Sequence, residues 1–491
     1  MISRFRLVAT LALLLPVVGA AQQTTPPLTL EECIARALGQ NFDLQIQTFT
    51  KDSAGQTLLI AEADFEPDLT FTTSRSESVQ ATASSTLDGA ANPSNTAYNN
   101  RLSATQRIST GATVTAATNL NRAGSNSRNA LLNPSFNSDF ALTVRQPLLA
   151  GSGRAFNRAA IERARIGVDR AALDFKTSVL TVVRNVEAAY YNVGFAREQV
   201  SVRRFSLELA ERLLEENKAR MNTGIATDLE VLQAEVGVAN ARRALLQAEQ
   251  TVRNNEDSLL NLIGRFEFNS SLGSVSLADA PVPAVSFEHS YQLARDNAPN
   301  YASSRLSIEQ IKLDVLTTKS QARPALSFGA TGGYNARESS PGRSAEELWS
   351  GDGYNWTLDL QLNMPLGFKA EKARHRQAII NLAREEARLQ QIEQTLLVEV
   401  RSAVRSVQTN IESVEISAKA TELSQRQFDL EKARFDAGIS TFRRVQESQE
   451  DLDTARVSEL QARIALRLAL ADLARLEASS LERYKITVDQ Q

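Results

Sequence analysis

Long stretches of the chain mix apolar and polar residues that favour helices, with no proline to interrupt them. One stretch runs from Arg158 to Leu262 and is dominated by Ala, Leu, Val, Glu, Arg and Gln, which helices tolerate or favour. A turn at 222–227 divides it, so the pattern predicts two long antiparallel helices. At about 1.5 Å per residue the first arm, 158–221, would be about 96 Å long. A hairpin of that reach indicates a rod that spans a gap or lines a tunnel.

Shorter segments alternate apolar and polar residues with a period of two, which is the pattern of a β-strand with one apolar face. The clearest are 69–74, 140–145 and 358–363. A further pair, 102–108 and 114–120, supports two interpretations: two additional strands, or a long ordered excursion on the surface. The polar stretches between these segments have the composition of exposed loops: Gln80–Asn100, Ala123–Ser138 and Asn335–Asp352.

The alternation alone fits both a soluble sheet, whose apolar face is a core, and a membrane barrel, whose apolar face meets lipid. Each group of strands lies between long helices, and no second apolar layer is near enough in the sequence to cover it. This order favours the barrel. Four to six strands are too few to close a barrel, for which ~8 is the practical minimum, so an oligomer is expected.

Two shifts along the sequence reveal a tandem duplication. Moved by 257 positions, Thr29–Phe71 lies on Ser286–Phe328 without a gap, and moved by 214 positions, Gly224–Thr227 lies on Gly438–Thr441. The two copies are expected to be halves of one fold. The expected units are a signal peptide (1–21), a first repeat (22–264, with a strand hairpin at 67–147 and a helical hairpin at 158–262), a linker (265–285), a second repeat (286–478, with hairpins at 324–365 and 372–478) and a tail (479–491).

The N-terminus has the features of an export signal. Arg4 and Arg6 precede an apolar run, Leu7–Val18, which small residues follow. The run is too short to span a bilayer as a helix. The mature chain is therefore expected to begin near Ala21 and to leave the cytoplasm.

Residues 29–62 are expected to form one helix, which Thr29 and Glu32 would open with a capping box. This segment contains Cys33, the chain's single cysteine. One cysteine leaves no partner for an internal disulfide and no cysteine metal cluster. Its place in a helical pattern predicts a core residue.

Composition argues against several other functions. The formal charge of −3 lacks the basic excess that a nucleic-acid partner usually requires. No G-x-x-x-x-G-K-[ST] loop is present, so ATP binding through a P-loop is not expected. His289 and His375 have no other His or Cys nearby in sequence, which predicts no metal or other cofactor. We expect no enzymatic activity, and transport energy would have to come from a partner.

The order of these parts resembles the TolC outer-membrane efflux family. The features that carry the resemblance are the signal peptide, the duplicated strand hairpins, Gln146–Leu149 leading into a long helix, and the tips Gly224–Thr227 and Gly438–Thr441. The resemblance implies a mainly α fold with a membrane β-barrel. Three copies would share one outer-membrane barrel and would build a helical tunnel across the periplasm of a Gram-negative-type bacterium. The barrel would have twelve strands, or eighteen if the pair between 102 and 120 joins it.

The two helix tips are the candidate working parts. Gly224 is suited to a left-handed residue that ends the first arm, and Thr227 with Glu230 would form a capping box on the second. The other tip keeps Gly438 and Thr441 but has an arginine where the box would want an acid.

The resemblance implies that the tips close the periplasmic end of the tunnel and that a periplasmic adaptor docks there, linking the channel to an inner-membrane transporter. The positions that match the constriction are Arg444 and Glu447, where the family often has acids. Arg443 or Arg444 of an adjacent tip is expected to pair with Glu230. The resemblance thus predicts a passive outer-membrane channel for efflux or type I secretion. The alternative is a periplasmic coiled-coil adaptor or scaffold, which would have a single hairpin flanked by β-rich domains.

Overall fold

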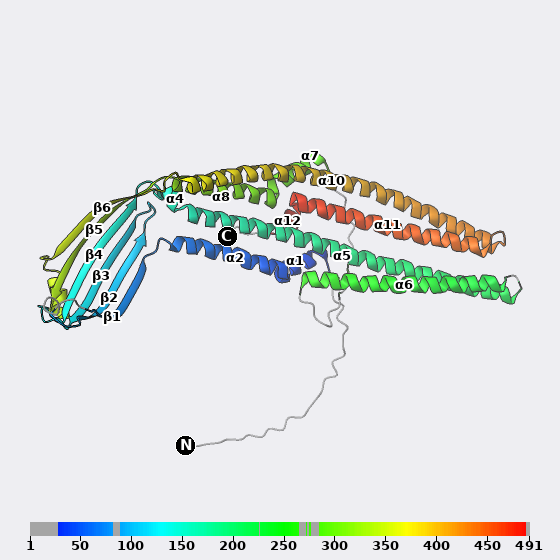
Figure 1. The fold of residues 1–491 in the computed structure, drawn as a ribbon. Coiled ribbons are helices and arrows are strands. Elements are labelled where there is room, and N and C mark those ends of the chain that lie inside the picture. Colours follow the sequence, from blue (N-terminus) through cyan, green and yellow to red (C-terminus); the bar gives the residue numbers. More distant parts are fainter. Residues whose placement is uncertain are drawn as a thin grey trace, which may run out of the picture.

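The computed structural model describes residues 28–81, 89–224, 226–264, 272, 274–275 and 284–487. This part of the chain is elongated, with a sheet at one end and two helix tips at the other (Figure 1). The expected signal peptide, most of the expected linker and the end of the tail lie outside the described residues. No helix in the described part combines the length and the apolarity needed to cross a bilayer.

Two very long helices run from the sheet to the tips (Figure 1). They are α5 (Ala159–Asn222), with 64 residues, and α10 (Lys369–Asp436), with 68 residues. From the tips, α6 (Asp228–Ile263) and α11 (Phe442–Glu477) return to mid-length. These four helices form the two long hairpins that the sequence predicts.

Shorter helices fill the half next to the sheet and repeat the same order. The bounds of α1 (Leu30–Gln40), moved by 257 positions, are those of α7 (Phe287–Asn297). At the same shift α2 (Phe42–Ala63) coincides with α8 (Pro299–Gln321) at its first residue and falls one residue short at its last. The duplication is therefore a property of the structure as well as of the sequence. The remaining helices are α4 (Arg154–Asn157), α9 (Pro341–Glu347) and α12 (Ser479–Arg483).

The prediction of one helix over 29–62 is wrong, because the helix breaks at Asn41. The capping box of Thr29 and Glu32 is confirmed at the start of α1. Asn41 ends α1 with extended backbone and caps α2 with its side-chain oxygen, which accepts from the Asp43 N–H at 2.9 Å. Its amide also donates to the Leu262 carbonyl oxygen at 3.1 Å. Asparagine is a strong N-cap residue, and apolar spacing continues on both sides, so periodicity alone conceals the break.

The six strands form one antiparallel sheet in which each pairs with the next along the chain. The segments 102–108 and 114–120 are therefore strands of the sheet and not a surface excursion. Figure 1 shows the sheet as a curved layer beyond the ends of α5 and α10. The strands are β1 (Asp68–Val79), β2 (Ser94–Arg107), β3 (Thr113–Ser125), β4 (Ser135–Pro147), β5 (Ala325–Glu338) and β6 (Tyr354–Asn363).

The expected loops are shorter than their composition predicts. β2 begins inside the first polar stretch, at Ser94, and β5 runs into the third as far as Glu338. The third stretch also contains α9. The reason is that ladder hydrogen bonds join backbone groups, so a strand can continue with polar side chains on both faces beyond the point where one face is apolar.

The strand register gathers apolar side chains on one face of the sheet. Phe71 lies opposite Leu102, and Phe140 lies opposite Tyr334, which lies opposite Tyr354. The other face is polar and internally bonded. There the Thr143 and Thr331 hydroxyls lie 3.1 Å apart, and Arg145 lies 3.4 Å from Asp359. One face is thus suited to lipid and the other to water.

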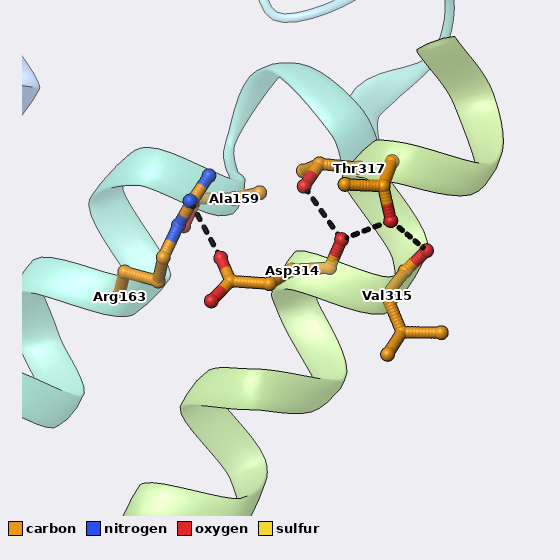
Figure 2. Close-up of polar contacts among 6 residues, drawn as sticks. Ala159, Arg163, Asp314, Val315 and Thr317 are labelled. Atoms are coloured by element: carbon orange, nitrogen blue, oxygen red, sulfur yellow. Dashed lines mark hydrogen bonds and ion pairs between the residues drawn. The ribbon is translucent and has the colours of Figure 1, made fainter. Parts of the chain in front are cut away.

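A polar clamp joins the two repeats where the helices approach the sheet. Figure 2 shows Arg163 of α5 reaching the Asp314 carboxylate of α8, with the guanidinium and carboxylate 2.9 Å apart. Arg163 also donates to the Ala159 carbonyl oxygen, and Thr317 donates to that of Asp314. The clamp fixes α8 against a helix of the other repeat.

The largest apolar core lies at mid-length, where α1, α5, α6 and α12 meet. Cys33 is fully buried in it, as predicted from its helical pattern. Burial raises the pKa of the Cys33 thiol to about 11, because the thiolate would lose its hydration. Tyr190 is buried beside it and donates to the Leu28 carbonyl oxygen at 3.1 Å.

We expect Cys33 to resist maleimide labelling in the folded protein at pH 7.5 and to react fully after denaturation. The thiolate is the reactive form, and here it is both scarce and inaccessible. Mass spectrometry before and after denaturation measures the labelled fraction. Rapid labelling of the folded protein would contradict this placement.

Candidate gate at the helix tips

The first tip is a tight turn from α5 into α6. Gly224 has a φ of 76°, and its N–H donates to the Met221 carbonyl oxygen at 2.9 Å. Glycine adopts this left-handed conformation without the strain that a side chain would add. The Thr227 N–H donates to Glu230 at 2.8 Å, and the Glu230 N–H donates to the Thr227 hydroxyl. The capping box predicted here is confirmed.

The second tip has the same turn with different side-chain contacts. Gly438 has a φ of 75°, whereas Thr441 makes no capping hydrogen bond through its side chain. The tip is tied instead through Glu431 near the end of α10. Ser440 and Arg434 each donate to its carboxylate at 2.8 Å. The Ser440 hydrogen bond, followed by Arg434 and the nearby charge of Arg444, lowers the pKa of Glu431, so the tie persists through mildly acidic pH.

The structure brings together some of the charged residues predicted at the tips. Arg443 and Glu447 form an exposed ion pair along α11 at 2.9 Å. Arg444 contributes instead to lowering the pKa of Glu431 through its charge. Glu230 is bound within its own turn, and its pairing with an arginine of an adjacent tip stays a prediction.

A contact between the two tips was not apparent from the sequence. Arg220 of α5 donates to the Phe435 carbonyl oxygen of α10 at 3.2 Å, and its guanidinium lies 4.0 Å from the centre of the Phe435 ring. That ring packs against Phe442 at the start of α11, and both rings are buried. The only sequence signal was that Arg220 and Arg434 occupy equivalent places in the two repeats. The arginine holds the end of one hairpin to the end of the other.

A second cross-hairpin contact lies above the tips. Gln449 of α11 donates to the Ser206 carbonyl oxygen of α5 at 3.3 Å, and both residues are buried. Leu209 of α5 and Leu452 of α11 belong to one apolar cluster at the same interface. Among the described residues, no three His, Cys, Asp or Glu side chains lie close enough to hold a metal ion. The contacts described at the tips are aromatic packing, ion pairs and hydrogen bonds.

Comparison with known proteins assigns the family. A family model described as "Outer membrane efflux protein" matches residues 124–265 and 290–478, more than half of the chain. The chain belongs to the outer membrane efflux protein family. The members of this family are outer-membrane transport channels and not enzymes. This confirms the resemblance found in the sequence.

Solved structures of similar fold are outer-membrane channels. The channel OprN has a TM-score of 0.69 at 15% sequence identity, covering 91% of this chain and 89% of its own. CmeC of Campylobacter jejuni has a TM-score of 0.68 at 15% sequence identity, and the match covers 94% of this chain and 90% of CmeC. VceC of Vibrio cholerae has a TM-score of 0.67 at 15% identity, and the match covers 91% of this chain and 95% of VceC. The fold class is thereby confirmed as helical tunnel plus β-barrel.

Curated relatives match over part of their length. The pyoverdine export outer membrane protein OpmQ of Pseudomonas aeruginosa is 27% identical over 270 residues, or 53% of this chain and 52% of the relative. OpmQ of Pseudomonas putida is 27% identical over 180 residues, which are 36% of this chain and 38% of that relative. The matched region thus spans about half of these relatives or less.

Replacing Arg220 with Gln should loosen the tips. The change removes a cation–π contact and one inter-hairpin hydrogen bond, worth together about 1–2 kcal/mol. We expect about a tenfold rise in the open population, measured as conductance in planar bilayers. Arg212→Gln is the matched control, because Arg212 is exposed on the same helix and pairs only with Glu208 among the described residues. Equal conductance of the two variants would show that Arg220 does not restrain the tips.

Proposed function

We propose that three copies of the chain form a channel through the outer membrane that continues as a helical tunnel into the periplasm. The supporting observation is a mismatch between the repeats. Leu209 on α5 is 8% exposed because α11 covers it, whereas its copy on α10, Leu423, is 53% exposed. Ser206 and Gln449 are likewise buried, but their copies Ala420 and Glu235 are exposed. A neighbouring chain that repeats the α5–α11 contact would cover the second set.

Both flanks of the chain carry exposed apolar side chains that such a neighbour would bury. We call one the α10 flank and the other the α2–α6 flank. Each flank groups several large apolar side chains, whereas apolar residues on a monomer surface are usually scattered singly. Pairing one flank with the other is a head-to-tail contact, which closes a ring when the rotation fits. The α10 flank comprises Ile379, Ile380, Val398, Ile416, Leu423 and Leu430, and the α2–α6 flank comprises Phe42, Ile46, Phe49, Leu229, Leu232, Val236 and Leu246.

The sheet supports the same ring. β1 and β6 are its two edges, and an edge strand exposes unpaired backbone groups. Pairing β1 of one chain with β6 of the next would remove every edge, as a membrane requires. Three chains would then give eighteen strands, a size at which barrels enclose an aqueous channel. This pore would be wider than a twelve-stranded one.

Within this assembly the channel conducts passively, and opening consists of untwisting the tips around Gly224 and Gly438. Energy comes from an inner-membrane transporter joined through a periplasmic adaptor. The small residues at the tips, including Ala226 and Ser440, allow adaptor helices to approach closely. The cargo we propose is small molecules, by analogy with relatives named for pyoverdine export. The six-stranded sheet disfavours the rival adaptor function.

A crosslinking experiment tests the ring. With Cys33 replaced by Ser, the pair Glu235→Cys and Ala420→Cys should form a disulfide between chains under mild oxidation with copper phenanthroline and give a covalent trimer on non-reducing denaturing gels. The control pair, Ser206→Cys and Gln449→Cys, occupies the equivalent contact inside one chain and should crosslink without a change in oligomer mass. If the first pair stays monomeric while the control reacts, the proposed ring is wrong.

The tip charges are tested by ion selectivity. Arg444→Ser would remove three positive charges from the constriction and should raise cation over anion permeability. Glu447→Gln would free Arg443 and should shift selectivity the other way. Glu459→Gln is the control, since this acid pairs with Arg463 on the same helix away from the tip. Reversal potentials in salt gradients measure the shift, and if neither tip variant differs from the control, the selective constriction lies elsewhere.

A further inference from the structure

Two arginines and a tyrosine form a cluster across three neighbouring strands. Tyr98 of β2 lies directly opposite Arg75 of β1 and Arg122 of β3 in the register. The Arg75 guanidinium is 5.3 Å from the centre of the Tyr98 ring, and that of Arg122 is 5.5 Å away. Two guanidinium groups, one from each neighbouring strand, thus lie within cation–π reach of the same aromatic ring.

The cluster belongs to the apolar face of the sheet. Successive side chains of a strand alternate between faces, so Arg75 shares a face with Phe71 and Tyr98 shares it with Leu102. The cluster lies about 14 Å beyond the Phe71–Leu102 pair, at ~3.4 Å per residue. This direction leads away from the helices (Figure 1). Between the pair and the cluster this face carries Thr73 opposite Asn100, so polar side chains replace apolar ones before the cluster is reached, as at the boundary of a barrel's apolar band.

The charges of the cluster do not balance among the described residues. Glu77 lies 4.0 Å from Arg75 and supplies one negative charge against two positive ones. Both arginines are exposed on the face that would meet lipid. At the boundary of the apolar band an arginine is tolerated on the lipid-facing side of a barrel at little cost, and its guanidinium lies level with the charged lipid headgroups. The position therefore favours a negatively charged group from the membrane itself.

We propose that Arg75, Tyr98 and Arg122 bind the phosphate of an anionic lipid headgroup in the outer leaflet. A guanidinium group often binds phosphate through two parallel N–H···O hydrogen bonds, and the tyrosine hydroxyl offers a further donor. Below the cluster, Phe71, Leu102 and other exposed apolar side chains provide a surface for acyl chains. A soluble anion would gain nothing from that surface, which favours a lipid. The proposal rests on the closed barrel with its apolar face outward.

Native mass spectrometry of the full-length trimer in detergent tests the site. The probe is diphosphorylated lipid A, compared with dioleoylphosphatidylcholine, and inorganic phosphate serves as competitor. The test variant is Arg75→Gln/Arg122→Gln. The control is Arg101→Gln/Arg337→Gln, which removes two positive charges from the opposite, polar face of the same sheet, where Arg101 lies opposite Thr72 and Arg337 opposite Asn137.

We expect the test variant to bind lipid A about tenfold more weakly than the wild type and the control to bind it unchanged. If the double variant fails to trimerise, Arg122→Gln alone should weaken binding about threefold. The site is overturned if the variants bind like the wild type, if the control weakens equally, or if millimolar phosphate displaces the lipid. A wild-type chain that forms no trimer would instead refute the proposed assembly.

Discussion

The sides of two very long helices have to be covered along their whole length, and one chain covers only part of them. α5 is covered by α6 on one side and by α11 on the other. α10 packs against α11, but between α8 and the tip its other side carries exposed apolar side chains. Burying a large apolar side chain contributes about 1.5–3 kcal/mol, so the six residues of the α10 flank represent on the order of 10 kcal/mol. That amount is comparable with the whole stability of a typical domain. The proposed assembly would bury these side chains, which the single chain leaves exposed.

The duplication suggests how the surfaces for a neighbouring chain are encoded in the sequence. Because α6 and α11 have equivalent bounds in the two repeats, the contact between α5 and α11 inside the chain would be a template for the proposed contact between chains. The tips depart from this equivalence. Arg220 binds the aromatic pair Phe435–Phe442, while its copy Arg434 binds Glu431. Alternate tips around a ring would thus be held by different forces, aromatic packing at one and charge at the next.

Much of the architecture was predictable because it depends on local or repetitive signals. The long hairpins follow from uninterrupted helix-forming residues, and the sheet follows from period-two alternation. The capping box at Thr227 needs only residues three positions apart. The break at Asn41 was missed because an asparagine within continuous apolar spacing looks like an ordinary polar position. The outer ends of the strands were missed because ladder hydrogen bonds leave no trace in side-chain polarity.

The contact of Arg220 with Phe435 could not be predicted for a different reason. It joins residues far apart in sequence, and its geometry depends on how two rods converge at their ends. The family resemblance pointed instead to Arg444 and Glu447, and the alignment of the repeats pointed to Arg443 or Arg444 as a partner for Glu230. Of these, Arg443 and Glu447 pair along one helix, and at the tips it is Arg220 and a buried ring that join the two hairpins.

The two unlike flanks also have a genetic consequence. In a ring closed head to tail, every subunit presents its α10 flank to one neighbour and its α2–α6 flank to the other. A chain with one damaged flank can still join a ring through the intact one, but the ring then cannot close. When intact and damaged chains are made together in equal amounts, only a minority of rings contain intact chains alone. A loss-of-contact allele of this protein would therefore behave as dominant over the normal one.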